Sequence, residues 1–148
     1  MTLKRTERMV NSAMALESMR DLGITLQQAL TEMADNAIDA GCRHLAFHLD
    51  VRENGHLRIV VADDGIGVPM AHPSQPEVKQ TLRHVLRFGG RIPHVGRHHP
   101  IGRFGFGLSQ AITCLTLRTT VYSKTSGQPW RSAVYDFEHL KANDALLM

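Results

Sequence analysis

The chain has 148 residues, 43% of them hydrophobic and 21% charged, so its composition is that of one globular domain rather than a disordered or fibrous chain. Its 17 Lys and Arg against 14 Asp and Glu leave a formal charge of +3 without a basic block, which gives only weak support for nucleic-acid binding. No apolar run reaches the roughly 20 residues of a membrane span, no signal peptide is evident, and the two cysteines lack disulfide or zinc spacing. We therefore expect a soluble, cytoplasmic protein that does not contact a membrane.

The first 40 residues predict two helices. The first spans residues 7–20, with apolar side chains on one side, and Asp21-Leu22-Gly23 ends it. The second spans residues 25–40. Thr25 with Gln28 three residues later fits a capping box, and apolar residues then recur at helical spacing until Gly41, a residue typical of helix C-termini.

A β-hairpin is predicted next. Residues 45–51 and 57–61 alternate between apolar and polar side chains, and Asn54-Gly55 between them is a strong hairpin signal. The second run leads directly into Asp63-Asp64-Gly65-Ile66-Gly67, which is too rich in glycine to continue a strand.

The second half of the chain predicts two more helices and two more strands. The helices are expected at residues 77–88 and from Leu108 onward, and the strands at about 117–123 and 131–137. The order of elements predicts an α+β fold in which helices pack on one face of a sheet that is mostly antiparallel.

Three side chains on the predicted helix at residues 25–40 suggest a metal-dependent site. Glu32 and Asn36 are four residues apart and share one face, and Asp39 lies nearby, beside the apolar stripe. Asn36 can bind a divalent cation through its amide oxygen, while Glu32 takes a proton from a water. A solvated helix face gives the same pattern, so the spacing alone leaves both interpretations open.

Asp63 stands where a strand ends and glycines begin. The strand holds the carboxylate in place, while Gly65 and Gly67 let the backbone approach a flat ligand, such as a planar ring that carries an amine. An ordinary turn is the alternative interpretation of Asp-Asp-Gly.

A second glycine run, at residues 102–107, precedes a predicted helix. Free backbone N–H groups and the helix dipole favour phosphate at such a place. The run is not a Walker A loop, because no Gly-Lys-Ser/Thr ends it, and it does not follow a strand as a dinucleotide fingerprint does. Taken alone, it is a weak signal.

The order and separation of these three segments resemble those of the GHKL ATPases, the group of gyrase, heat-shock chaperones, histidine kinases and MutL, with MORC and related bacterial ATP-binding proteins the most similar. The N box corresponds to residues 32–40 (EMADNAIDA), the first glycine box to residues 63–67 (DDGIG) and the second to residues 102–107 (GRFGFG). The resemblance runs from about Leu22 to Tyr122. It implies the Bergerat fold, a two-layer α+β sandwich with a mixed, mostly antiparallel sheet, here abbreviated at its C-terminus.

The resemblance also implies roles for individual residues. Glu32 would be the general base, Asn36 the ligand of Mg²⁺, and Asp39 a support for the base or for the waters of the metal. Asp63 would accept the adenine amino group, with Gly67 shaping the adenine pocket. The other residues of the implied ATP site are Gly65 in the first glycine box and Gly102, Arg103, Phe104, Gly105 and Gly107 in the second, which closes over the phosphates as part of a lid at about residues 69–107.

By the same resemblance, residues 1–148 form a single domain that binds ATP and hydrolyses it with Mg²⁺. Nucleotide binding would close the lid and pair two chains, or control a separate effector protein. The intact Glu32 favours hydrolysis. Two alternatives stay open, an anti-sigma-type serine kinase and a nucleotide sensor that does not hydrolyse ATP. The second arises because the family's catalytic lysine usually comes from a further domain, and neither Lys124 nor Lys141 is a convincing substitute, so turnover would be slow or dependent on a partner.

Overall fold

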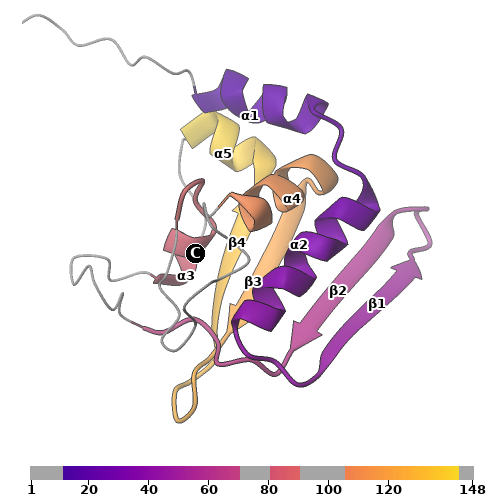
Figure 1. Ribbon diagram of the computed structural model, residues 1–148. Helices are drawn as coiled ribbons and strands as arrows, with labels where there is room; N and C mark the ends of the chain where they lie inside the picture. Colours follow the sequence, from indigo (N-terminus) through magenta and orange to yellow (C-terminus); the bar gives the residue numbers. More distant parts are fainter. Residues whose placement is uncertain (1–11, 71–80, 91–105, 144–148) are drawn as a thin grey trace, which may run out of the picture.

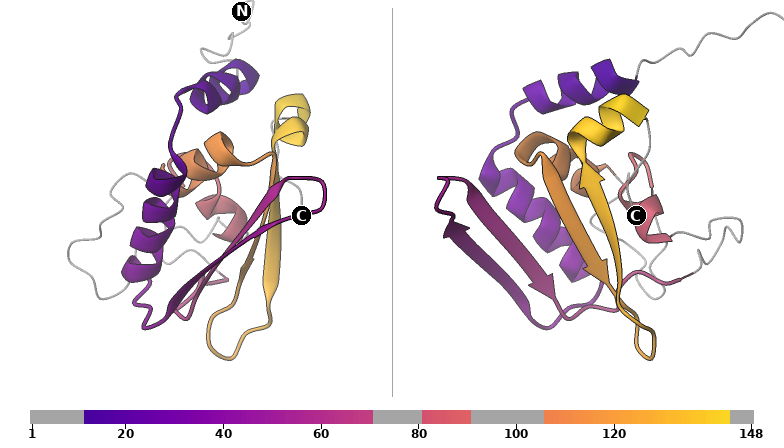
Figure 2. Two further views of the ribbon diagram at one scale, coloured as in Figure 1. Left: turned by 90° about the vertical axis from the view of Figure 1, so that its right-hand side faces the viewer. Right: turned by 180° about the vertical axis from the view of Figure 1, so that it is seen from behind.

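The computed structural model describes residues 12–70, 81–90 and 106–143. Its elements in chain order are α1 (Ser12–Asp21), α2 (Leu26–Asp39), β1 (Leu45–Val51), β2 (Leu57–Asp63), α3 (Thr81–Val85), α4 (Gly107–Leu115), β3 (Arg118–Ser123), β4 (Arg131–Asp136) and α5 (Phe137–Asn143). Helices α2, α3 and α4 lie on one side of the four strands, while α1 and α5 lie together at one end (Figures 1 and 2). The predicted α+β class, with helices on one face, is confirmed.

The strands pair as two antiparallel hairpins. In the first, Leu45 lies opposite Asp63 and Val51 opposite Leu57. In the second, Arg118 of β3 lies opposite Asp136 of β4. Within the described residues, backbone hydrogen bonds do not join the two hairpins into one sheet. The Asn54-Gly55 turn is confirmed, because Gly55 has a φ of +79°, which glycine adopts readily.

Helix α2 begins and ends as the sequence predicts. The Thr25 hydroxyl accepts a hydrogen bond from the Gln28 N–H at 3.2 Å, and the Thr25 N–H donates to the Gln28 side chain at 2.9 Å, which completes the capping box. Ala40 caps the C-terminus, and Gly41 follows with a φ of +72°.

Other element boundaries differ from the prediction. Residues 7–11 of the first predicted helix and 77–80 of the third lie outside the described residues. The described part of the third helix ends at Val85 rather than at residue 88. It ends early because the residues after Val85 form tight turns, in which Leu86 N donates to Arg83 O and Arg87 N to His84 O.

Helix α5 was not predicted, and the strand predicted up to residue 137 stops at Asp136. The Asp136 carboxylate accepts a hydrogen bond from the His139 N–H at 3.0 Å, as an N-cap does. The sequence pattern does not reveal this cap, because the apolar alternation of the strand continues through Phe137.

The core lies between the β3–β4 hairpin and helices α1, α3, α4 and α5. Its buried members are Leu16, Leu82, Leu86, Ile112, Ala133, Tyr135 and Phe137. Helix α4 is held at its C-terminus by Arg20 of α1, whose Nη1 donates to the carbonyls of Thr113 and Thr116 at 3.1 and 2.8 Å. On its inner side, the buried Thr113 hydroxyl lies 2.6 Å from that of Tyr135. These contacts fix α4, whose first residue belongs to the candidate site.

Among the described helices, none is long and apolar enough to cross a membrane.

Candidate functional site

The centre of the candidate site is a contact between α2 and α4. Glu32 lies on α2, and its carboxylate packs directly against Gly107, the first residue of α4. A Cβ at position 107 would lie 1.9 Å from Glu32 Oε2, so any larger residue there would displace this carboxylate from its present position. The negative charge therefore stands at a helix N-terminus, where the helix dipole favours anions. The fold thus joins the segment that resembles the N box to the end of the second glycine segment.

Asn36 and Asp39 follow Glu32 along α2 but differ in exposure. The Asn36 side-chain amide donates to the Glu32 carbonyl at 2.8 Å, and the residue is exposed. Because its NH₂ group is used within the helix, its Oδ1 is the atom available to a ligand. Asp39 is only 5% exposed, so its side chain is buried, whereas that of Asn36 faces solvent.

Asp63 is the last residue of β2 and is exposed. Its Oδ1 accepts a hydrogen bond from the Gly65 N–H at 2.9 Å, which holds the carboxylate over the turn that follows. That turn packs on the C-terminal end of α2: Ile66 N donates to Ala40 O at 3.0 Å, and a Cβ on Gly65 would lie 2.7 Å from the Ala40 Cβ. Asp63 is therefore held at a fixed position relative to the helix that carries Glu32.

Gly67 is held on its other side by the β3–β4 hairpin. Its φ is +72°, and a Cβ there would lie 2.0 Å from the backbone oxygen of Lys124. The next residue, Val68, donates its N–H to the buried Ser123 hydroxyl at 2.8 Å, and its carbonyl accepts a hydrogen bond from Arg131. The glycine turn is thus wedged between α2 and β3–β4, where no larger residue fits at position 67.

Asp64 has a different environment from its neighbour Asp63. Its Oδ1 accepts hydrogen bonds from the backbone N–H groups of Arg43 and His44 at 2.7 and 2.8 Å, and its Oδ2 lies 2.7 Å from His44 Nδ1. The backbone and side chain of His44 and the backbone of Arg43 hold the pKa of Asp64 well below its ordinary value. The two adjacent carboxylates of the glycine turn therefore have separate partners.

Comparison with known families supports the resemblance carried by these segments. Residues 24–148 match the family described as histidine kinase-, DNA gyrase B-, and HSP90-like ATPase, and this range contains the N box and both glycine segments. The chain belongs to this ATPase family. It is also 29% identical to the DNA gyrase B protein of Micrococcus luteus over 114 residues, which is 75% of this chain and 16% of the gyrase protein. The chain therefore spans about a sixth of the length of that relative.

The family supports an ATP-binding domain of the GHKL type, as the sequence predicts. The nearer resemblance to MORC and MutL proteins stays a prediction, because the relative reported above is a gyrase protein.

Part of the site predicted for this ATPase domain lies outside the described residues. This applies to Gly102, Arg103, Phe104 and Gly105, and to most of the predicted lid. Of the second glycine box, the described members are Gly107 and Phe106, whose ring centroid lies 6.2 Å from that of Phe88. This ring contact links the start of α4 to the turns after α3.

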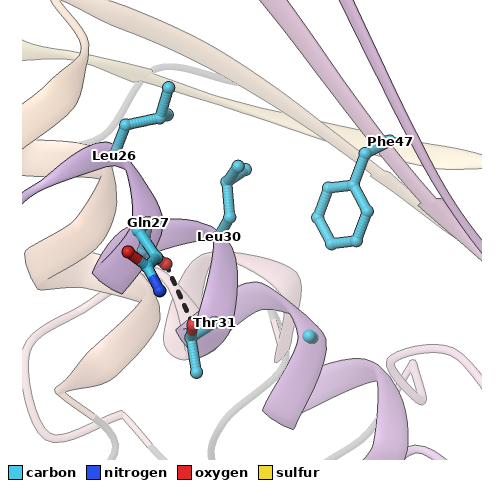
Figure 3. Close-up of a pocket in the computed structure, with 6 residues that line it drawn as sticks. Leu26, Gln27, Leu30, Thr31 and Phe47 are labelled. Atoms are coloured by element: carbon cyan, nitrogen blue, oxygen red, sulfur yellow. Dashed lines mark hydrogen bonds between the residues drawn. The ribbon is translucent and has the colours of Figure 1, made fainter.

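An open apolar cavity of about 590 Å³ lies elsewhere in the ATPase domain, between α2 and β1. In Figure 3, the ring of Phe47 on β1 points toward α2, where Leu26 and Leu30 line the cavity. Neither Glu32 nor Asn36 lines this cavity. The cavity is therefore separate from the candidate site, and it was not predicted from the sequence.

Proposed function

We propose that this chain binds ATP together with Mg²⁺ and hydrolyses it, with Glu32 as the general base. The observation that carries the proposal is the contact between the Glu32 carboxylate and Gly107 at the N-terminus of α4. A helix N-terminus preceded by glycines suits phosphate, and hydrolysis needs a base beside the terminal phosphate to orient a water. The base and the phosphate-binding segment are therefore adjacent, as this reaction requires.

Asp63 is proposed to recognise adenine. Its Oδ1 is engaged by the Gly65 N–H, so Oδ2 is the atom that accepts a hydrogen bond from the adenine amino group. Gly65 and Gly67 keep side chains away from the plane of the base. Asp63 is better suited to that role than its neighbour Asp64, because both carboxylate oxygens of Asp64 are already engaged by Arg43 and His44.

Asn36 is proposed to hold the magnesium. Its exposed amide oxygen is a hard ligand of the kind that Mg²⁺ accepts, and the described residues contain no cluster of three or more His, Cys, Asp or Glu that would form an all-protein metal cage. This fits a cation that is bound largely through nucleotide phosphates and waters, where it neutralises their charge. Asp39, which is buried, would steady the base or the waters of the metal.

The remaining parts of the proposal concern the whole chain. We assign residues 1–148 to one ATP-binding domain, with a lid at about 69–107 and the phosphate contacts completed by Gly102, Arg103, Phe104, Gly105 and Gly107. Lid closure would promote pairing of two chains or control of a separate effector protein. Binding to nucleic acid is not part of the proposal.

The test is phosphate release from ATP by the purified chain, measured with Mg²⁺ and with excess chelator. Release is expected only with Mg²⁺, at a rate below the ~10 s⁻¹ that is typical of enzymes, because no lysine of the described residues is assigned to the phosphates. Binding of ATP without release would favour the nucleotide sensor. Transfer of labelled phosphate to a serine of another protein would favour the kinase, and the absence of both binding and release would contradict the proposal.

A further inference from the structure

Asp64 connects two segments that the proposed function needs in fixed relation. One is the loop after α2, which contributes the N–H groups of Arg43 and His44 and the His44 ring. The other is the glycine turn, which begins at Asp63. A hydrogen bond of 3.3 Å from Asp64 N to His44 O adds to the three made by the carboxylate. We call this set of contacts between Asp64 and residues 43–44 the Asp64 latch.

The Asp64 latch lies beside a second set of contacts between the same two segments. Ile66 N donates to Ala40 O, and Gly65 packs on Ala40. The turn is thus attached at Asp64 and again at residues 65–66. Asp63, whose carboxylate is the proposed acceptor for adenine, immediately precedes these anchor points. Its backbone direction therefore depends on the latch.

The charge of Asp64 explains why it suits this role and not ligand binding. An ionised carboxylate accepts charge-assisted hydrogen bonds, which are stronger than those of a neutral amide. All three partners come from residues 43 and 44, and each oxygen of the carboxylate has at least one of them. To bind Asp64, the amino group of a nucleotide would have to displace a hydrogen bond that this carboxylate already makes. Asp63 can accept the amino group at Oδ2, because its hydrogen bond to Gly65 uses Oδ1.

We propose that Asp64 is a positioning residue for base recognition: by clamping residues 43–44 to the start of the glycine turn, it directs the Asp63 carboxylate at the base and so sets the preference for adenine over bases without the amino group. The inference rests on the proposed function, since it assumes that Asp63 contacts the base. It adds a determinant of specificity that does not itself touch the nucleotide.

The test compares the dissociation constants of ATP and of inosine triphosphate, which carries an oxygen in place of the amino group. Asp64→Ala is expected to weaken ATP binding about tenfold and inosine triphosphate binding much less, so that the preference for ATP falls. Asp64→Asn should recover most of the preference, because its Oδ1 still accepts the two backbone N–H groups. Phosphate release at saturating ATP should stay within about twofold of wild type, because Glu32 and Gly107 are untouched.

The matched control is Asp50→Ala. Asp50 lies on β1, near the end of the β1–β2 hairpin that is distant from the glycine turn, and it accepts a hydrogen bond from Arg58 Nε at 2.8 Å. Its substitution therefore also removes a paired carboxylate, but one that does not hold the glycine turn. It should leave both dissociation constants unchanged. His44→Ala removes only the side-chain contact of the latch and should lower the preference by about threefold, which keeps the test decisive if Asp64→Ala does not fold.

Two results would overturn the inference while leaving the proposed function intact. In the first, Asp64→Ala keeps the wild-type ratio of the two dissociation constants, or His44→Ala keeps it if Asp64→Ala does not fold. In the second, both nucleotides weaken equally, which is the behaviour of a merely structural contact. A wild-type chain that binds ATP no better than inosine triphosphate would instead contradict the role of Asp63, and the inference would fall with it.

Discussion

Glu32→Gln is expected to lower the rate of phosphate release at saturating ATP by roughly 10²- to 10⁴-fold, while ATP affinity stays within about threefold of wild type. Glutamine has nearly the same shape as glutamate and still fits against Gly107, but its amide does not take a proton from water. Because the substitution removes proton transfer rather than a binding contact, the loss should appear in kcat and not in the dissociation constant. Steady-state phosphate release and calorimetric titration measure the two quantities separately.

The control for this prediction is Glu53→Gln, which removes a carboxylate from the exposed turn between β1 and β2. It should leave kcat unchanged. If Glu32→Gln hydrolyses ATP at the wild-type rate, some other group activates the water, and the role assigned to the contact with Gly107 is wrong.

Gly67→Ala is expected to reduce the free energy of unfolding by about 3 kcal/mol, a large share of the roughly 5–15 kcal/mol of a domain of ordinary stability. Two costs combine at this position. The φ of +72° disfavours any residue with a Cβ, and the added Cβ would lie 2.0 Å from the backbone oxygen of Lys124, which belongs to the chain after β3 and does not simply rotate away. Urea denaturation followed by circular dichroism measures the change.

Gly127→Ala separates these two costs. Gly127 has the same φ of +72°, but a Cβ there would meet no atom within 4 Å. This variant should lose only about 1 kcal/mol, the cost of the backbone conformation. Equal losses for the two variants would show that the approach of Lys124 to Gly67 contributes nothing.

The elements that the sequence predicts well are those specified by local signals. The capping box of Thr25 and Gln28 defines the start of α2, and Asn54-Gly55 with the alternation around it defines the β1–β2 hairpin. Helix α5 lacks such an unambiguous signal. The alternation of Ala133, Tyr135 and Phe137 is typical of a continuing strand, and the helix is decided by the Asp136 cap and by the burial of Phe137 in the core.

The candidate site divides in the same way. The shared face of Glu32 and Asn36 follows from their spacing on a helix. Both residues also lie within residues 24–148, the range that matches the ATPase family. The approach of Glu32 to Gly107 does not follow from spacing, because it depends on how α4 packs against α2. Nor does the sequence show that Asp63 and Asp64 have different hydrogen-bond partners. Their difference arises from the loop after α2, which brings the N–H groups of residues 43 and 44 to only one of the two carboxylates.

The central claim is that this chain binds ATP with Asp63 at the base and Glu32 beside the phosphates, and calorimetric titration of wild type and Asp63→Ala with ATP and Mg²⁺ tests it most directly. Wild type is expected to bind one ATP per chain with a dissociation constant between about 1 μM and 1 mM, and Asp63→Ala at least about tenfold more weakly. A wild-type chain that is folded and does not bind ATP, or an Asp63→Ala variant that binds it as tightly as wild type, would contradict the claim.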